Sequence, residues 1–150
     1  MSEKRVLNNI IGGERVAAVS GQTQDLVNPS TGQVFAEAPV SGPEDVDRAY
    51  AAASAAFVEW RDSTPSERQK ALLAMADLFE EHAEELVAIE SENTGKPIAV
   101  TMSEEIPPMV DQIRFFAGAA RVLEGRAAGE YMKGFTSIIR REPIGVIGQV

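Results

Sequence analysis

The hydrophobic and polar residues follow two different periods along the chain. Over residues 8–40 the apolar residues form short runs separated by turn residues, which is typical of β-strands. Gly12-Gly13 lies between two such runs and predicts a hairpin. A strand at 26–28 leads into an Asn-Pro turn that ends at a glycine, and a further short strand is expected at 34–40.

Over residues 41–125 the apolar residues instead recur every three or four positions, the period of an amphipathic helix. Ser41-Gly42-Pro43-Glu44 and Thr64-Pro65-Ser66-Glu67 both have capping-box spacing and predict two helix starts. Gly95-Lys96-Pro97 predicts a helix end, and Pro107-Pro108 predicts a start or kink in a third helical region. The apolar faces are expected to comprise Val46, Ala49, Ala53, Phe57 and Trp60, then Leu72, Ala76, Phe79, Ala83, Leu86 and Val87, then Val110, Ile113, Phe116, Ala117, Ala120 and Leu123.

The pattern returns to strand at the end of the chain. Residues 135–142 are mixed in polarity, and Pro143 should interrupt pairing or lie at a sheet edge. Residues 144–150 are apolar enough for a strand buried on both faces, and such a strand needs neighbours and a crossover helix. The residues alone therefore indicate an α+β piece whose last strand belongs to a sheet that is missing.

Composition excludes several classes of protein. The chain has 150 residues with 14 basic and 23 acidic side chains, a formal charge of -9, which argues against binding to nucleic-acid phosphates or to anionic membranes. It contains no Cys, so disulfides, thiolate metal sites and a cysteine nucleophile are all excluded within it. No apolar run is long enough to span a membrane, and no apolar signal core is present at the start, so the cytoplasm is the default compartment.

Few residues suggest chemistry on their own. His82, the single histidine, lies in the acidic run 80–85, and both are expected on a solvated helix face. Glu104-Glu105 has two interpretations: negative charge near a helix N-terminus, or a carboxylate pair at a pocket mouth that awaits a cationic ligand. Gly145-x-x-Gly148 lacks the spacing of a phosphate loop, and Phe115-Phe116 is expected in the core. These residues alone give no function.

Five segments, taken together, carry a resemblance. They are Asn28-Pro29-Ser30-Thr31-Gly32; Phe57-Val58-Glu59-Trp60 followed by Pro65 and Arg68; Thr94-Gly95-Lys96-Pro97; Phe115-Phe116-Ala117-Gly118; and Arg141-Glu142-Pro143-Ile144-Gly145-Val146-Ile147-Gly148-Gln149. In this order they resemble the NAD(P)-dependent aldehyde dehydrogenase superfamily, from about residue 8 to residue 150. Residues 105–121 and 128–131 are more particularly similar to γ-aminobutyraldehyde dehydrogenases, with betaine aldehyde dehydrogenases nearby.

The resemblance implies an α/β fold and a reaction. Members of that family oxidise aldehydes to acids with a cysteine nucleophile, a glutamate-activated water and NAD as hydride acceptor. In the family these catalytic residues follow the position of Val150, so none is expected on this chain, and Val150 itself matches only the edge of the cofactor-contacting segment. The resemblance also implies a cytoplasmic homotetramer or homodimer.

Two sites carry over by position. Glu105 matches an acidic residue at the substrate entrance of aminoaldehyde-type members, where a carboxylate would attract the ammonium of the substrate. A second polar or acidic residue often follows three positions later in the family, but Pro108 stands there. The carbonyl of Val27 and the side chain of Asn93 match a monovalent-cation site, where family members often have Asp in place of Asn93. Oxygen ligands of this kind suit a hard cation.

The resulting hypothesis divides the chain into four parts. Residues 1–40 would be N-terminal strands, 41–125 the helical part of the NAD-binding domain, 126–142 the oligomerisation strand region, and 143–150 the truncated first strand of a Rossmann-like sheet. The whole would be the N-terminal part of an NAD-dependent dehydrogenase acting on an ω-aminoaldehyde such as 4-aminobutanal, inactive and poorly stable as these 150 residues alone. The alternatives are a non-catalytic interaction module that binds a full-length relative or another chain, and an independent small-molecule-binding helical domain.

Overall fold

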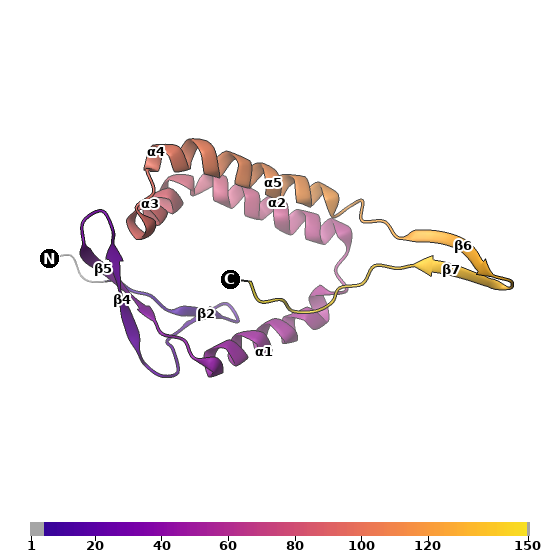
Figure 1. The fold of residues 1–150 in the computed structure, drawn as a ribbon, viewed down its shortest axis with the longest axis horizontal. Coiled ribbons are helices and arrows are strands. Elements are labelled where there is room, and N and C mark those ends of the chain that lie inside the picture. Colours follow the sequence, from indigo (N-terminus) through magenta and orange to yellow (C-terminus); the bar gives the residue numbers. More distant parts are fainter. Residues whose placement is uncertain (1–4, 150) are drawn as a thin grey trace.

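The computed structural model describes residues 5–149 as a mixed α/β arrangement of small sheets and helices (Figure 1). In chain order the elements are β1 (Arg5–Val6), β2 (Asn9–Ile11), β3 (Glu14–Val16), β4 (Thr23–Asn28), β5 (Gln33–Pro39), α1 (Pro43–Trp60), α2 (Pro65–Glu81), α3 (Ala83–Thr94), α4 (Ile98–Val100), the π-helical turn η1 (Thr101–Glu105), α5 (Ile106–Ala119), β6 (Arg126–Met132) and β7 (Phe135–Ile139).

The N-terminal strands form as the pattern predicts. β2 and β3 pair as an antiparallel hairpin whose turn residues Gly12 and Gly13 have φ of 61° and 84°, values that favour glycine. β4 pairs antiparallel with β5, and β1 adds to the other side of β5 in parallel. The guanidinium of Arg5 in β1 pairs with Glu92 of α3 and lies 5.3 Å from the ring centroid of Phe35. These contacts attach the three-stranded sheet to the helices.

The start of α1 differs from the prediction by one residue. Gly42, not Ser41, is the N-cap, and the capping carboxylate belongs to Asp45. Asp45 is buried, and its two oxygens accept hydrogen bonds from the backbone N–H groups of Gly42 and Val19, each at 3.0 Å. These hydrogen bonds hold the pKa of Asp45 below its ordinary value of 3.8. The cap lies one residue later because Pro43 occupies the first helical position, where its missing N–H costs nothing.

The capping box of α2 is confirmed, but the helix that follows is shorter than expected. The Thr64 hydroxyl accepts a hydrogen bond from the Glu67 N–H at 3.3 Å, and the backbone N–H of Thr64 donates to the Glu67 carboxylate. The pattern gave no sign of a break before Gly95, yet α2 ends at Glu81 and α3 begins at Ala83. His82 separates them with φ -100° and ψ 16°, outside the helical region, and its side chain is exposed as predicted.

The apolar face predicted for α2 and α3 is confirmed. Ala76, Ala83 and Val87 are buried, and the other three members are half-buried. The acidic residues of 80–85 face solvent, as expected. α5 packs lengthwise against α2 (Figure 1), with Val110 and Ala117 buried between them, and Arg114 of α5 joins Asp77 and Glu80 of α2 at 2.9 and 2.6 Å.

Other predicted core positions are exposed. Phe115 and Phe116 are 67% and 59% exposed and contact each other edge to face, and Val46 and Trp60 on the expected face of α1 are about half exposed. The total accessible surface is 11772 Å², whereas a compact monomer of 16.1 kDa exposes about 7,400 Å². The described chain therefore satisfies the helical pattern of α2 and α3 but leaves other apolar faces open.

The C-terminal region consists of a hairpin followed by a segment without strand pairing. β6 and β7 form an antiparallel hairpin that projects away from the helices (Figure 1). The strand expected at 144–150 stays a prediction, because residues 144–149 have no neighbouring strand within the described residues, and Ile144 and Ile147 are 90% and 72% exposed. Gly148 instead lies against the hydroxyl of Tyr50 on α1. The described residues offer this segment no neighbouring strand, so its backbone has no ladder to join.

Among the described residues, no helix is long and apolar enough to cross a membrane.

Candidate functional site

The candidate site lies where the chain leaves α3 and enters α4. Gly95 caps α3 with φ 78°, and its N–H donates to the Ser91 carbonyl at 2.9 Å. The Thr94 hydroxyl donates to the Glu90 carbonyl at 2.8 Å and accepts from the Lys96 N–H at 3.3 Å. Since only glycine adopts this left-handed conformation without strain, the Thr-Gly-Lys sequence produces a tight turn that fixes the backbone of Lys96.

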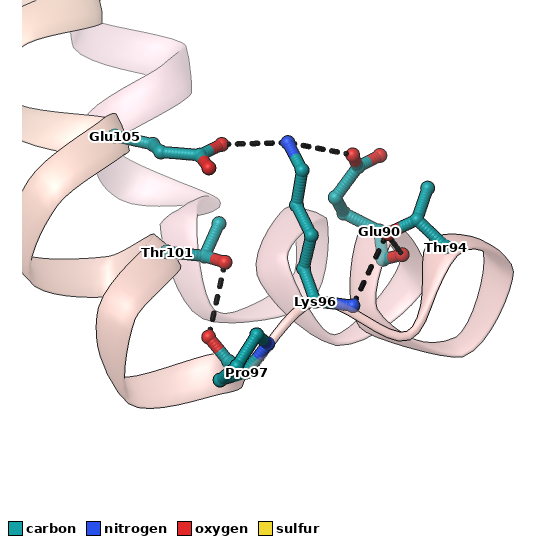
Figure 2. A network of polar contacts seen from close by, with 6 residues as sticks. All are labelled: Glu90, Thr94, Lys96, Pro97, Thr101 and Glu105. Carbon is teal, nitrogen blue, oxygen red and sulfur yellow. Dashed lines mark hydrogen bonds and ion pairs between the residues drawn. The ribbon is translucent and has the colours of Figure 1, made fainter. Parts of the chain in front are cut away.

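The turn directs the Lys96 side chain between two carboxylates (Figure 2). Its Nζ lies 2.9 Å from Oε2 of Glu105 and 3.2 Å from Oε1 of Glu90. All three side chains are a little less than half exposed. The hydrogen bonds to Glu105 and then to Glu90 raise the pKa of Lys96, so the ammonium stays charged at neutral pH and the three groups together carry one negative charge.

The position of Glu105 depends on the prolines that follow it. Glu105 ends the π-helical turn η1 and immediately precedes α5, whose first turn contains Pro107 and Pro108. Because these prolines have no N–H, the carbonyls four residues earlier lose their usual α-helical donors, and a wider turn accommodates the loss. Pro108 also confirms that no second carboxylate stands three residues beyond Glu105. The pair precedes a helix, as one interpretation of Glu104-Glu105 expects, and the interpretation as a carboxylate pair at a pocket mouth stays a prediction.

The predicted cation ligands Val27 and Asn93 lie on neighbouring elements. Val27 is in β4 and Asn93 in α3, and these two elements are in contact. The pairing of β4 with β5 is irregular between Leu26 and Val27, and such an irregularity takes backbone groups out of the regular ladder. A backbone carbonyl and a side-chain amide are suitable donors for a hard monovalent cation. Within residues 5–149, no group of three His, Asp or Glu side chains is placed to hold a metal.

The remaining sequence predictions have different outcomes. Val150, the expected cofactor contact, lies outside the described residues. The expectation that Gly145 and Gly148 form no phosphate loop stays a prediction, because the described chain continues only to residue 149. Lys96 and Glu90 are site residues that the sequence did not predict, because the helix stop already accounts for Lys96. Separations of six and fifteen residues from Glu90 to Lys96 and Glu105 match no helical or strand period that would have linked them.

The class of protein follows from comparison with known sequences and structures. The family model described as "Aldehyde dehydrogenase family" matches residues 16–150. An aldehyde dehydrogenase from Alternaria alternata is 39% identical over 141 residues, which are 93% of this chain and 28% of that protein. An acetaldehyde dehydrogenase from Pseudomonas aeruginosa is 40% identical over 142 residues, 95% of this chain and 28% of that protein.

A solved structure has the same fold. The NAD⁺ complex of an aldehyde dehydrogenase from Bacillus cereus superposes with a TM-score of 0.86 and 34% identity, over 95% of this chain and 29% of that chain. This chain belongs to the aldehyde dehydrogenase family, and it corresponds to an N-terminal portion of it. The chain spans about 28% of the length of the relatives named above. These relatives are general aldehyde dehydrogenases, and none of them gives support to the interaction-module alternative.

Proposed function

We propose that this chain is the N-terminal part of an NAD-dependent aldehyde dehydrogenase that oxidises an ω-aminoaldehyde, such as 4-aminobutanal, to the amino acid. The observation that carries the dehydrogenase is the family match over residues 16–150, and the aminoaldehyde substrate rests on the position of Glu105. NAD as cofactor is supported by solved relatives in complex with NAD⁺, including the Bacillus cereus enzyme. NAD supplies a hydride acceptor for the aldehyde carbon.

The contribution of this chain would be substrate selection rather than bond chemistry. The sequence contains no Cys, so no thiol nucleophile comes from these residues. Glu105 offers an exposed carboxylate beside Glu104, and the group of Glu90, Lys96 and Glu105 carries one negative charge. Such a surface attracts an alkylammonium in preference to a neutral aldehyde of the same length.

Further parts of the hypothesis rest on position alone. The β6–β7 hairpin, which projects from the helices with Phe135, Ile138 and Ile139 exposed, would pair with another subunit in a homodimer or homotetramer. Val27 and Asn93 would hold a monovalent cation, residues 143–150 would join the nucleotide-binding sheet, and Val150 would reach the cofactor. The proposed location is the cytoplasm, which cell fractionation tests.

The test of the substrate compares cationic and neutral aldehydes. In the whole protein that contains this chain, NADH formation is measured with 4-aminobutanal and with butanal, before and after Glu105→Gln. We expect the KM for 4-aminobutanal to rise about two- to five-fold, the range given by exposed ion pairs, with kcat and the KM for butanal unchanged. Glu104→Gln is the matched control, because Glu104 neighbours Glu105 but accepts from Ser103 rather than Lys96.

Two outcomes would refute the proposal at different levels. Equal KM changes for both aldehydes would refute ammonium recognition by Glu105 while leaving the oxidation of aldehydes intact. No NADH formation from either aldehyde, in a folded protein supplied with NAD, would refute the dehydrogenase itself.

A further inference from the structure

We propose that Lys96 is a specificity-determining residue. Its ammonium is a tethered cation that pairs with the carboxylate of Glu105 until a cationic substrate displaces it. After displacement, Lys96 stays paired with Glu90. The inference deepens the proposed function and rests on it. Neither Lys96 nor Glu90 touches the reacting carbon in this account; both act through Glu105.

The Lys96 ammonium already occupies the position of a bound substrate amine. Lys96 Nζ is 2.9 Å from Glu105 Oε2, which is the distance at which a substrate ammonium would itself bind a carboxylate. Lys96 and a substrate amine are therefore chemically equivalent ligands for the same oxygen. A cationic aldehyde has to compete with an ammonium that is already part of the chain, whereas a neutral aldehyde has no such competitor.

Glu90 offers Lys96 a second partner when it leaves Glu105. Its Nζ is also 3.2 Å from Glu90 Oε1 (Figure 2), so a small rotation of its side chain away from Glu105 leaves one ion pair intact. The Lys96 side chain is 43% exposed, and its four-carbon stem gives it the freedom to rotate. Because Glu90 retains Lys96, no charge is left unpaired when Glu105 exchanges partners.

The charges of the group balance when a substrate ammonium binds. Two carboxylates and one ammonium leave a net charge of minus one, and one substrate ammonium brings the group to neutrality. Glu90 is thus required for the exchange although it lies on α3, away from Glu105. Without Glu90, Lys96 would have Glu105 as its one remaining partner in this network, and the carboxylate would be less available to substrate.

The backbone around the turn supports this arrangement. Thr94, Gly95 and Pro97 fix the main chain on both sides of Lys96, and Thr101 donates its hydroxyl hydrogen to the Pro97 carbonyl at 3.1 Å. The anchor of the side chain is therefore fixed while its charged end is exposed. The turn therefore fixes the backbone of Lys96 at a position from which its side chain reaches both carboxylates.

The test uses the whole protein that contains this chain and measures KM for 4-aminobutanal and butanal, together with inhibition by n-butylammonium. For Lys96→Met we expect the KM for 4-aminobutanal and the inhibition constant of n-butylammonium to fall about two- to five-fold, with butanal unchanged. For Glu90→Gln we expect both constants to rise by a similar factor. Lys96→Arg, which keeps the tethered cation, should behave like the native protein, and Lys70→Met on α2 is the control for loss of one lysine.

The double variant Lys96→Met/Glu90→Gln separates this mechanism from simple attraction by Glu90. If Glu90 only attracted the amine through its charge, its substitution would have the same effect with and without Lys96. We expect the Glu90→Gln effect to shrink clearly when Lys96 is Met, because the partner that Glu90 retains is gone. Additive effects, or a Lys96→Met variant that binds n-butylammonium no better than the native protein, would overturn the inference.

These results can be distinguished from failure of the proposed function. If Glu105→Gln selectively weakens 4-aminobutanal but the Lys96 and Glu90 variants do not change it, the tether is refuted and ammonium recognition stands. If Glu105→Gln affects both aldehydes equally, ammonium recognition is refuted and the tether with it. If Lys96→Met fails to fold, Lys96→Gln gives the same comparison with a polar side chain.

Discussion

Gly95 connects the stability of α3 to the position of Lys96, and its replacement by alanine tests that connection. Its φ of 78° is in the left-handed region, and a Cβ added there would lie 3.1 Å from Cγ of Pro29 in the turn after β4. The substitution therefore introduces two separate strains, one in the backbone and one against Pro29.

The magnitude follows from these two strains. An alanine in the left-handed region destabilises the fold by about 1–2 kcal/mol. The alanine also lowers the conformational entropy of the unfolded chain, which offsets about 0.4–1 kcal/mol of this loss. The close approach to Pro29 adds to the cost, because a ring carbon at that distance has to move. We expect a net loss of about 1–2 kcal/mol in the free energy that opposes local opening of α3.

Hydrogen exchange measures this loss locally and does not require a two-state transition of the whole protein. Peptides that cover α3 and the following turn should exchange about five- to thirty-fold faster in Gly95→Ala. Gly32→Ala is the control for backbone strain alone, because Gly32 has φ 69° and its added Cβ meets nothing within 4 Å. Pro29→Ala in the Gly95→Ala background should recover the part due to the contact.

Gly118→Ala gives the opposite expectation. Gly118 is within α5, and a Cβ there also meets nothing within 4 Å, so alanine should stabilise the helix by about 0.5–1 kcal/mol. If Gly95→Ala exchanged as slowly as Gly118→Ala, the left-handed cap and the contact with Pro29 would not hold this turn, and the fixed anchor assigned to Lys96 would lose its basis.

Two further predictions concern pH and exposed surface. The pKa of Asp45 is lowered in the folded chain from 3.8, so its carboxylate stabilises the fold above that pH, and this contribution is lost as the pH falls through the lower folded pKa. Protection of the Val19 and Gly42 amides from hydrogen exchange should therefore decline in that acidic range, and Asp45→Asn should weaken this protection already at neutral pH. Unchanged protection would refute the cap. The 150-residue chain alone should bind a hydrophobic dye and melt without a sharp transition. The reason is its accessible surface of 11772 Å², compared with about 7,400 Å² for a compact monomer of this mass. A cooperative melt of a monomer that binds no dye would contradict the described exposure.

The parts of the fold that sequence predicted are those determined by neighbouring residues. Gly12-Gly13 and the Thr64 capping box act within four residues, and the α2–α3 face follows a period that the helix itself imposes. The break at His82 was not predictable from periodicity, because the stripe continues through it in register. The cap of α1 was placed one residue early, since the contribution of Asp45 depends partly on the N–H of Val19, which is 26 residues away.

The candidate site shows the same boundary between local and distant information. Glu105 was found through resemblance, but its ion pair with Lys96 depends on how α4 and η1 pack against α3. The helix stop is a sufficient local explanation for Lys96 in the sequence, so its charge gave no separate reason to predict a site residue there. A residue with a structural reason for its backbone can thus have a separate chemical role for its side chain.

The exposed predicted core positions bear on the proposed function. Phe115, Phe116 and Trp60 have the spacing of buried residues, and yet each is more than half exposed. A helical pattern predicts which face is buried, but it does not predict which segment buries that face. In a protein that continued as the aldehyde dehydrogenase relatives do, these faces and residues 144–149 would meet the parts that the relatives have and this chain does not show. The Glu90, Lys96 and Glu105 group differs, because these three side chains already pair with one another within the described chain. Substitutions of these residues therefore alter an ion-pair network that the described chain itself forms.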